Sequence, residues 1–164
     1  MEAAELKLLS RLFAYPEELP ATEDLARIGA TWREDEGREA LQALQAEYVR
    51  LFINALPEVP CPPYGSFYLE GTLMGESTVR LRKLYASYGW QTDEMPDHIA
   101  VELEFLALLA SLGQDGALEE DRQFIRDHLK LWAPAFLDRV GKNDRSGFYQ
   151  AVSRQAGKLL GLAL

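Results

Sequence analysis

The feature that most constrains the fold of this chain is a cluster of four prolines near its middle. They lie between Asn54 and Tyr64, at positions 57, 60, 62 and 63. Proline lacks a backbone N–H, and the residue before each proline is pushed to extended geometry, so this stretch cannot be helical. It predicts a stiff connection of about ten residues, which is longer than the usual link between two helices.

Apolar residues on both sides of the proline cluster recur at helical spacing. The alternation typical of a strand never persists, and β-branched residues are sparse. Five of the expected helices cover about 3–15, 38–53, 98–112, 118–132 and 146–164. A short helix capped by Thr22 and another capped by Ser77 or Thr78 and ended by Gly89 are also expected. Pro134 is expected to begin a separate short piece that ends at Gly141. The predicted fold class is all-α: a single-domain helical bundle over residues 1–164 with a long proline-rich mid-chain connection.

The charge and the composition of the chain limit its partners and its location. The formal charge is −9, from 26 acidic and 17 basic residues. This charge repels nucleic acid and suits a cationic partner, although solubility alone also explains an acidic chain. The sequence lacks a secretion signal and an apolar run long enough to cross a membrane, and the lone Cys61 suits a reducing compartment. We therefore expect a soluble, cytoplasmic protein without nucleic acid or stable membrane insertion.

The motifs of common enzymes are missing, which predicts that the protein is not an enzyme. The sequence contains no phosphate-binding GxxxxGK[ST] loop, no GxGxxG turn and no GxSxG nucleophile motif. Cys61 would need a histidine brought to it by the fold before it could act as a nucleophile. The two histidines, His98 and His128, do not form the paired Glu-x-x-His motifs of a di-iron bundle. We expect neither a metal site nor a cofactor.

The first of two distinctive loop-to-helix junctions covers residues 61–78. It places Tyr64, Phe67 and Tyr68 beside the proline-stiffened loop. Rigid aromatic side chains contribute a large contact area at a small entropic cost, which suits the capture of a peptide. The alternative is that Phe67, Tyr68 and Leu69 fill the interior of the bundle.

The second junction covers residues 94–106 and leads into the helix that is apolar on two faces, as central helices of bundles are. Asp97 is expected to cap this helix, with His98 in its first turn and able to bond a partner. The alternative is a plain cap followed by a solvated histidine. Glu102 shares a helical face with His98.

Several sequence runs extend these two junctions to most of the chain. They are Pro-Pro-Tyr-Gly-Ser-x-Tyr-Leu at 62–69, Leu-Met-Gly-Glu-Ser-Thr at 73–78, Pro-Asp-His-Ile at 96–99, Glu-Leu-Glu-Phe at 102–105, Tyr-Val-Arg-Leu-Phe at 48–52, Trp-Ala-Pro-Ala-Phe at 132–136 and Phe-Tyr at 148–149. In this order they resemble the TorD/DmsD/NarJ family of maturation chaperones for molybdenum oxidoreductases.

The resemblance implies an all-α chaperone that binds a twin-arginine signal peptide and the apoform of a molybdenum oxidoreductase of the dimethyl sulfoxide or trimethylamine oxide reductase type, until cofactor insertion and export. One alternative is an assembly chaperone for nitrate reductase that binds the apoenzyme, and another is a nucleotide-binding enzyme. The family also implies weak GTP binding, and either a monomer or a domain-swapped homodimer.

The binding residues that the resemblance implies are Tyr64, Ser66, Phe67, Tyr68, Leu69, Gly75, Glu76, Pro96, Asp97, His98 and Glu102. A twin-arginine peptide presents two guanidinium groups followed by an apolar stretch. The expected complement is an apolar groove with an acidic rim formed by Glu70, Glu76, Glu94, Asp97 and Glu102. An arginine over Tyr64 or Tyr68 would add a cation–π energy of about 0.5–2 kcal/mol.

Overall fold

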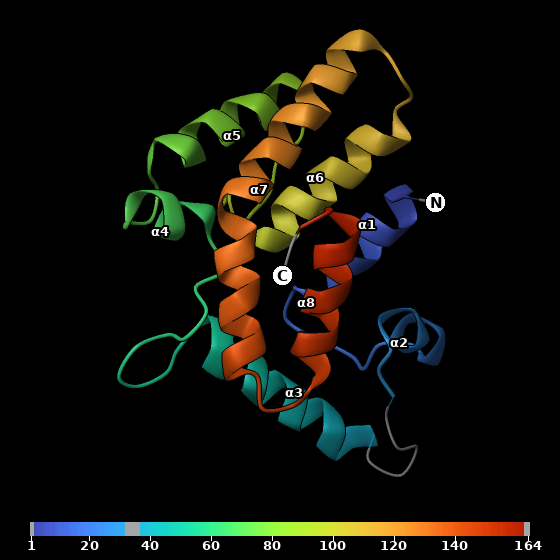
Figure 1. The fold of residues 1–164 in the computed structure, drawn as a ribbon, viewed down its shortest axis with the longest axis vertical. Coiled ribbons are helices and arrows are strands. Elements are labelled where there is room, and N and C mark those ends of the chain that lie inside the picture. Colours follow the sequence, from blue (N-terminus) through green and yellow to red (C-terminus); the bar gives the residue numbers. More distant parts are fainter. Residues whose placement is uncertain (1, 32–36, 163–164) are drawn as a thin grey trace.

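A computed structural model describes residues 2–31 and 37–162 of the chain. The helices are α1 (Glu2–Leu12), α2 (Thr22–Ile28), α3 (Gly37–Phe52), α4 (Gly65–Glu70), α5 (Glu76–Ser87), α6 (Ile99–Ser111), α7 (Gly116–Asn143) and α8 (Phe148–Leu159) (Figure 1). These ranges contain no strand, and their one isolated β-bridge joins Tyr64 to His98. The all-α prediction is confirmed. Among the described residues, no helix combines the length and the apolar character that crossing a bilayer requires.

Helix α6 lies at the centre of the bundle because both of its faces are apolar. It packs between α1 and α7, and α8 packs against α7 and α1. The short helix α4 lies on α7, with α5 next to it. Helix α3 runs across the lower ends of α7 and α8 in Figure 1. The prediction that this two-faced helix is central is therefore confirmed.

Five aromatic side chains, which we call the aromatic cluster, pack together where α3, α7, α8 and the end of α1 meet. They are Phe13, Tyr48, Phe52, Phe136 and Tyr149, and all are buried. Ring centroids lie 5.7 Å apart for Phe13 and Phe136, and 5.3 Å apart for Phe52 and Tyr149. Pairs of this kind contribute about 0.5–1.5 kcal/mol each beyond the burial of their area. The cluster joins the end of α1 to α3, α7 and α8.

The expected break at Pro134 is wrong, because α7 is one helix of 28 residues that runs through it. Proline removes one helical hydrogen bond, here to the carbonyl of Lys130, which is an exposed residue. Trp132 and Phe136 are fully buried on either side of the proline. The packing of these two rings outweighs the cost of one lost hydrogen bond.

Other predicted boundaries shift by a few residues. The helix α4 was not predicted, and Thr22 is the first residue of α2 and not its cap. The cap of α5 is Gly75, and Glu70 of α4 accepts a hydrogen bond from the Ser77 N–H at 3.0 Å. The last helix ends at Leu159, whereas its predicted end at Leu164 lies outside the described residues.

Candidate functional site

The two junctions lie side by side and are joined through their backbones. The Gly65 N–H donates to the Asp97 carbonyl at 3.0 Å, and the Ile99 N–H donates to the Pro63 carbonyl at 2.9 Å. The rings of Tyr64 and His98 meet edge to face, with centroids 5.3 Å apart. Segments about thirty residues apart in sequence therefore form one rigid corner.

Asp97 joins the two junctions from inside the protein. Its side chain is fully buried, and Oδ2 accepts a hydrogen bond from the Ser66 N–H at 2.7 Å. This bond satisfies one of the free amide groups at the start of α4. The prediction that Asp97 caps the helix that follows it is wrong: it binds the start of α4 instead. It also cannot form part of an exposed acidic rim.

His98 is the residue that caps α6, and it is buried. Its Nδ1 accepts a hydrogen bond from the Ala100 N–H at 3.0 Å, and only 4% of the residue is exposed. Burial lowers the pKa of His98 to about 4, although the carboxylates of Glu94 and Asp97 oppose the shift. The ring is therefore neutral near pH 7, and because Nδ1 accepts, the proton is on Nε2. The alternative of a solvated histidine is wrong, because the ring is buried, and His98 caps α6 and does not lie in its first turn.

A groove of about 520 Å³ opens beside this corner, and we call it the corner groove. Among the predicted binding residues, Tyr64 and His98 line it. Its aromatic and aliphatic surface comes from the end of α3 and the segment after α1, through Tyr15, Tyr48, Phe52 and Ile53. Tyr15 and Ile53 are exposed, at 41% and 56%. The groove thus offers apolar surface directly beside the corner.

The acidic groups of the corner groove differ in whether they already have a cation. Glu104 is paired with Lys7. The other base of the groove, Arg11, lies 3.6 Å from Asp24, so it already has an acidic partner. Glu94 has no ion pair within the described part of the chain, and its Oε1 accepts from the Met95 N–H at 2.9 Å. The Tyr64 hydroxyl lies 3.5 Å from the same oxygen. Glu94 is therefore the carboxylate in the groove that is open to a cationic ligand.

Glu102 lies on the opposite side of α6, in a second buried cluster. It is fully buried, with Oε2 2.8 Å from Nδ1 of His128 and Oε1 accepting from Nε1 of Trp132 at 3.2 Å. Burial raises the pKa of Glu102 to about 7, against the lowering effect of His128. Burial disfavours the charged form of His128, but its hydrogen bond to Glu102 raises its pKa overall. The prediction that Glu102 forms part of the binding rim is wrong.

Together, Ser66, Asp97, Glu102 and His128 form what we call the polar junction, where α4, α6 and α7 meet. Backbone contacts there are tight: a Cβ added to Gly65 would lie 2.9 Å from Nε1 of Trp132 and 3.1 Å from Cε1 of His128. Only glycine fits at this position without displacing one of the two rings. The polar junction thus supports the start of α4, and with it the corner.

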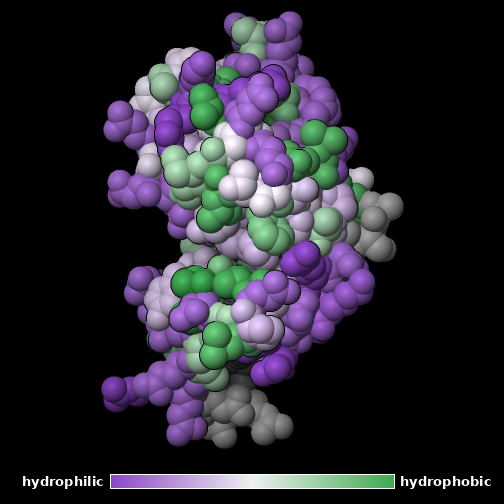
Figure 2. Space-filling view, turned by 90° about the vertical axis from the view of Figure 1, so that its left-hand side faces the viewer, coloured by the Kyte–Doolittle hydropathy of each residue, from purple (hydrophilic) through white to green (hydrophobic). Residues whose placement is uncertain are grey.

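The other predicted binding residues lie away from the corner groove. Pro96 is buried, and its carbonyl accepts from the Tyr85 hydroxyl at 2.7 Å. Tyr68 stacks on Trp132, and Arg139 lies over the rings of Phe67 and Tyr68. Gly75 and Glu76 lie at the start of α5. In Figure 2, polar areas separate the apolar groups on the face that carries α4 and α5. The exposed apolar side chains of these two helices and of the segment between them include Leu69, Leu73, Met74 and Val79.

The described residues show no arrangement suited to the chemistry of a metal or of a nucleophile. No group of three or more His, Cys, Asp or Glu side chains in them could hold a metal ion. Cys61 is completely buried, and burial raises the pKa of its thiol to about 12. A thiol of this kind stays protonated and unreactive at neutral pH.

Sequence reasoning missed the contribution of α1 and of the segment that follows it. Lys7, Ser10, Arg11 and Tyr15 all line the corner groove. The Ser10 hydroxyl donates to the Ala100 carbonyl at 2.6 Å, a contact that spans 90 residues of sequence. No local spacing indicates such a contact. The small polar Ser10, which interrupts the apolar face of α1, was the one available signal.

Comparisons with known proteins agree on one family. Residues 14–138 match a family model described as nitrate reductase delta subunit. The chain is 33% identical over 132 residues to chaperone protein TorD of Vibrio cholerae, which covers 73% of this chain and 60% of TorD. It is 34% identical over 140 residues to the Tat proofreading chaperone DmsD of Salmonella typhi, which covers 82% of this chain and 65% of DmsD. The chain thus spans somewhat less than two thirds of the length of these relatives.

One solved structure resembles the whole fold. It is a crystal structure from Archaeoglobus fulgidus, described as that of a candidate redox enzyme maturation protein. The TM-score is 0.65 at 34% sequence identity, and the match covers 98% of this chain and 94% of the other.

Proposed function

The chain belongs to the nitrate reductase delta subunit family, and from this premise we propose that it is a cytoplasmic maturation chaperone without catalytic activity. Its client would be the apoform of an exported molybdenum oxidoreductase of the dimethyl sulfoxide or trimethylamine oxide reductase type. In this proposal the protein holds the client's twin-arginine signal peptide until the cofactor is inserted. The corner groove is the binding site.

The observation that carries the proposal is the unpaired carboxylate of Glu94 at the edge of an apolar groove. A guanidinium group paired with Glu94 would lie near the ring of Tyr64, where a cation–π contact adds about 0.5–2 kcal/mol. The apolar stretch of the signal would contact Tyr15, Phe52 and Ile53. The Nε2–H of neutral His98 would donate to a backbone carbonyl of the peptide.

The test measures fluorescence anisotropy of a labelled peptide that carries two adjacent arginines followed by an apolar segment. We expect saturable binding that weakens as salt rises, because exposed charge pairs are screened. Replacing both arginines by lysines should weaken binding, because lysine lacks the planar guanidinium group. Glu94→Gln should weaken binding about fivefold, which corresponds to about 1 kcal/mol for an exposed pair. Equal loss of affinity in the control Glu120→Gln, an exposed acid on α7, would contradict the assignment.

A second candidate function is assembly of a nitrate reductase through its apoenzyme, and the match to the delta-subunit model favours it. The two functions differ in what the client must present. A client without its signal peptide should still co-purify with the chain if the protein assembles the apoenzyme. It should be lost if the signal peptide is the main point of attachment.

A further inference from the structure

One segment near the end of this acidic chain is rich in basic residues. The segment 139–158 contains five basic residues and one acidic residue, although the whole chain carries −9. The one acid, Asp144, is buried, and its two carboxylate oxygens accept from the N–H groups of Ser146 and Gln150 at the start of α8. The surface that this segment presents to solvent is therefore basic.

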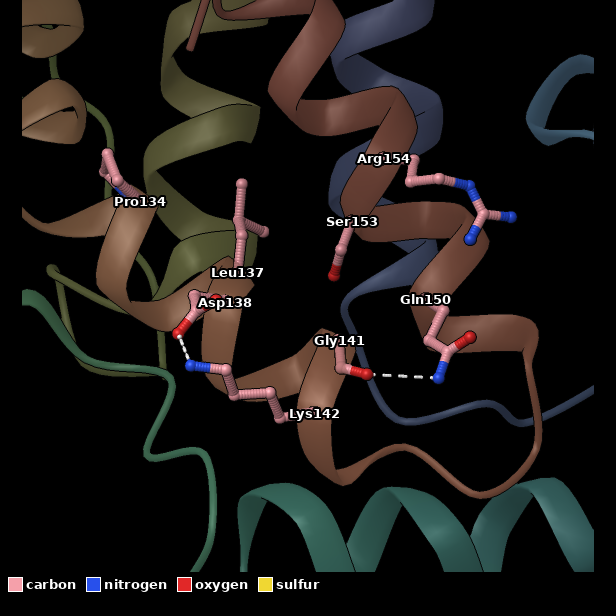
Figure 3. A pocket seen from close by; sticks show the side chains of 8 residues that line it. All are labelled: Pro134, Leu137, Asp138, Gly141, Lys142, Gln150, Ser153 and Arg154. Atoms are coloured by element: carbon pink, nitrogen blue, oxygen red, sulfur yellow. Dashed lines mark hydrogen bonds and ion pairs between the residues drawn. The ribbon is translucent and has the colours of Figure 1, made fainter. Parts of the chain in front are cut away.

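A hollow of about 510 Å³ lies between α7 and α8 at this basic end (Figure 3). Pro134 and Leu137 give it an apolar lining on the α7 side, and Ser153 and Arg154 line it from α8. It shares no lining residue with the corner groove. A Cβ built on Gly141, which also lines the hollow, would meet no atom within 4 Å apart from its neighbours in the chain and the backbone of its own helix. The hollow therefore has room for the side chain of another molecule.

The polar groups of the hollow include a donor without a partner. The Ser153 hydroxyl points into the space between the two helices, the residue is 3% exposed, and the oxygen has no hydrogen-bond partner among the described residues. A buried hydroxyl left unpaired lowers the stability of the fold. Ser153 is therefore a polar group that a ligand could satisfy.

The charges around the hollow favour an anionic ligand. Asp138 is already paired with Lys142 at 2.8 Å, so its negative charge is balanced. Arg154 is exposed and has no ion pair in the described ranges of the chain. The Gln150 side chain donates to the Gly141 carbonyl at 3.1 Å, and this hydrogen bond joins α8 to α7 at one end of the hollow. The charge left available at the rim is that of the Arg154 guanidinium.

We propose that the hollow between α7 and α8 binds an acidic side chain, glutamate or aspartate, on the surface of the client polypeptide. The carboxylate would accept from the Ser153 hydroxyl and pair with Arg154, while the methylene groups would contact Pro134 and Leu137. An acidic side chain fits better than a bare phosphate, because Pro134 and Leu137 offer apolar contacts that its methylene groups can use, and only one cation is unpaired. The inference rests on the proposed function, since it names a second contact with the same client, of opposite charge to the signal peptide.

The experiment is an NMR titration of the ¹⁵N-labelled protein with a hexaglutamate peptide, acetylated and amidated at its ends. We expect shift changes concentrated at the amides of Gln150, Ser153 and Arg154. Gly141→Glu adds a negative side chain in the open space and should weaken the peptide's affinity at least about tenfold. Gly141→Ala is the matched control, because alanine favours the helix and leaves the hollow open, so binding should persist.

Three outcomes would overturn the inference. The first is the absence of localised shift changes with hexaglutamate. The second is an equal loss of affinity in Arg154→Glu and Arg82→Glu, since Arg82 lies on α5 and a uniform response indicates non-specific attraction. The third is full competition by inorganic phosphate at the same concentration, which indicates a free-anion site.

A twin-arginine peptide titrated in parallel separates this inference from the proposed function. It should bind the wild-type protein and Gly141→Glu with the same affinity, because the two sites share no residue. If it fails to bind either protein, the signal-peptide function is contradicted, while the response to hexaglutamate still decides the assignment of the hollow.

Discussion

The aromatic cluster and the polar junction are equally buried, but they are built from opposite chemistry. In the aromatic cluster, five rings pack against one another, and the Tyr48 hydroxyl donates to the Phe13 carbonyl at 3.0 Å. The Tyr149 hydroxyl is buried there without a partner among the described residues. The polar junction buries two carboxyl groups, an imidazole and a hydroxyl. Ser66, Asp97 and His128 each have one buried polar atom without a partner among the described residues.

From this difference we infer that the aromatic cluster stabilises the whole fold, whereas the polar junction fixes a local geometry. Burial of apolar area accounts for the aromatic cluster. Unpaired buried polar atoms cost stability, so the polar junction is not explained by a gain in stability. It holds the start of α4 against α6, and that contact places Tyr64 beside His98. We therefore expect mutations in the two regions to differ in kind as well as in size.

The largest effect is expected in the aromatic cluster. Phe136→Ala should lower the free energy of unfolding by about 4 kcal/mol, because the ring is completely buried and contacts Phe13, Phe52 and Trp132. Urea denaturation followed by circular dichroism measures the change. Leu131→Ala, on the same helix and 70% exposed, is the control and should change stability by less than about 0.5 kcal/mol. A loss below about 1 kcal/mol for Phe136→Ala would contradict the role given to the cluster.

The next effect concerns the pH dependence of the corner. The pKa of His98 is lowered to about 4 in the folded protein, by burial first, with Glu94 and Asp97 opposing, against an unfolded value of 6.5. Between these two values the unfolded state therefore binds more protons than the folded state. The stability that the neutral His98 contributes is fully present above pH 6.5 and is lost as the pH falls towards 4. A shift of this size corresponds to about 3 kcal/mol.

Comparison with His98→Asn isolates this contribution. Asparagine also caps helices but does not titrate, so the variant should lack the part of the acid destabilisation that His98 causes. Urea midpoints of both proteins at pH 7, 5.5 and 4 measure the difference. Glu102, whose pKa is raised to about 7, acts with the opposite sign in both proteins and cancels in the comparison. Parallel pH profiles would show that His98 is not held neutral by burial.

The two regions also differ in how far the sequence predicts them. Tyr48 and Phe52 lie four residues apart on one apolar stripe, so local spacing identifies them as core. The bonds of the polar junction join residues 26 and 31 positions apart, and no local pattern relates them. Glu102 stands between apolar neighbours on a helix that is buried on two faces, which should have indicated that it is buried too. The family resemblance named residues on both sides of the corner, but it could not tell its exposed members from the buried ones, such as Asp97 and Glu102.

The smallest effect distinguishes backbone from side chain at residue 66. The Ser66 N–H donates to Asp97, whereas its buried hydroxyl has no partner among the described residues. Ser66→Ala should therefore change the free energy of unfolding by less than about 1 kcal/mol, and towards greater stability, because an unsatisfied hydroxyl is removed and alanine favours the helix. Asp97→Ala should instead cost about 1–3 kcal/mol, because the same N–H then loses its partner inside the protein. Urea denaturation of the two variants measures both changes. An equal loss in the free energy of unfolding for Ser66→Ala and Asp97→Ala would contradict the prediction, because it would mean that the Ser66 hydroxyl itself stabilises the polar junction.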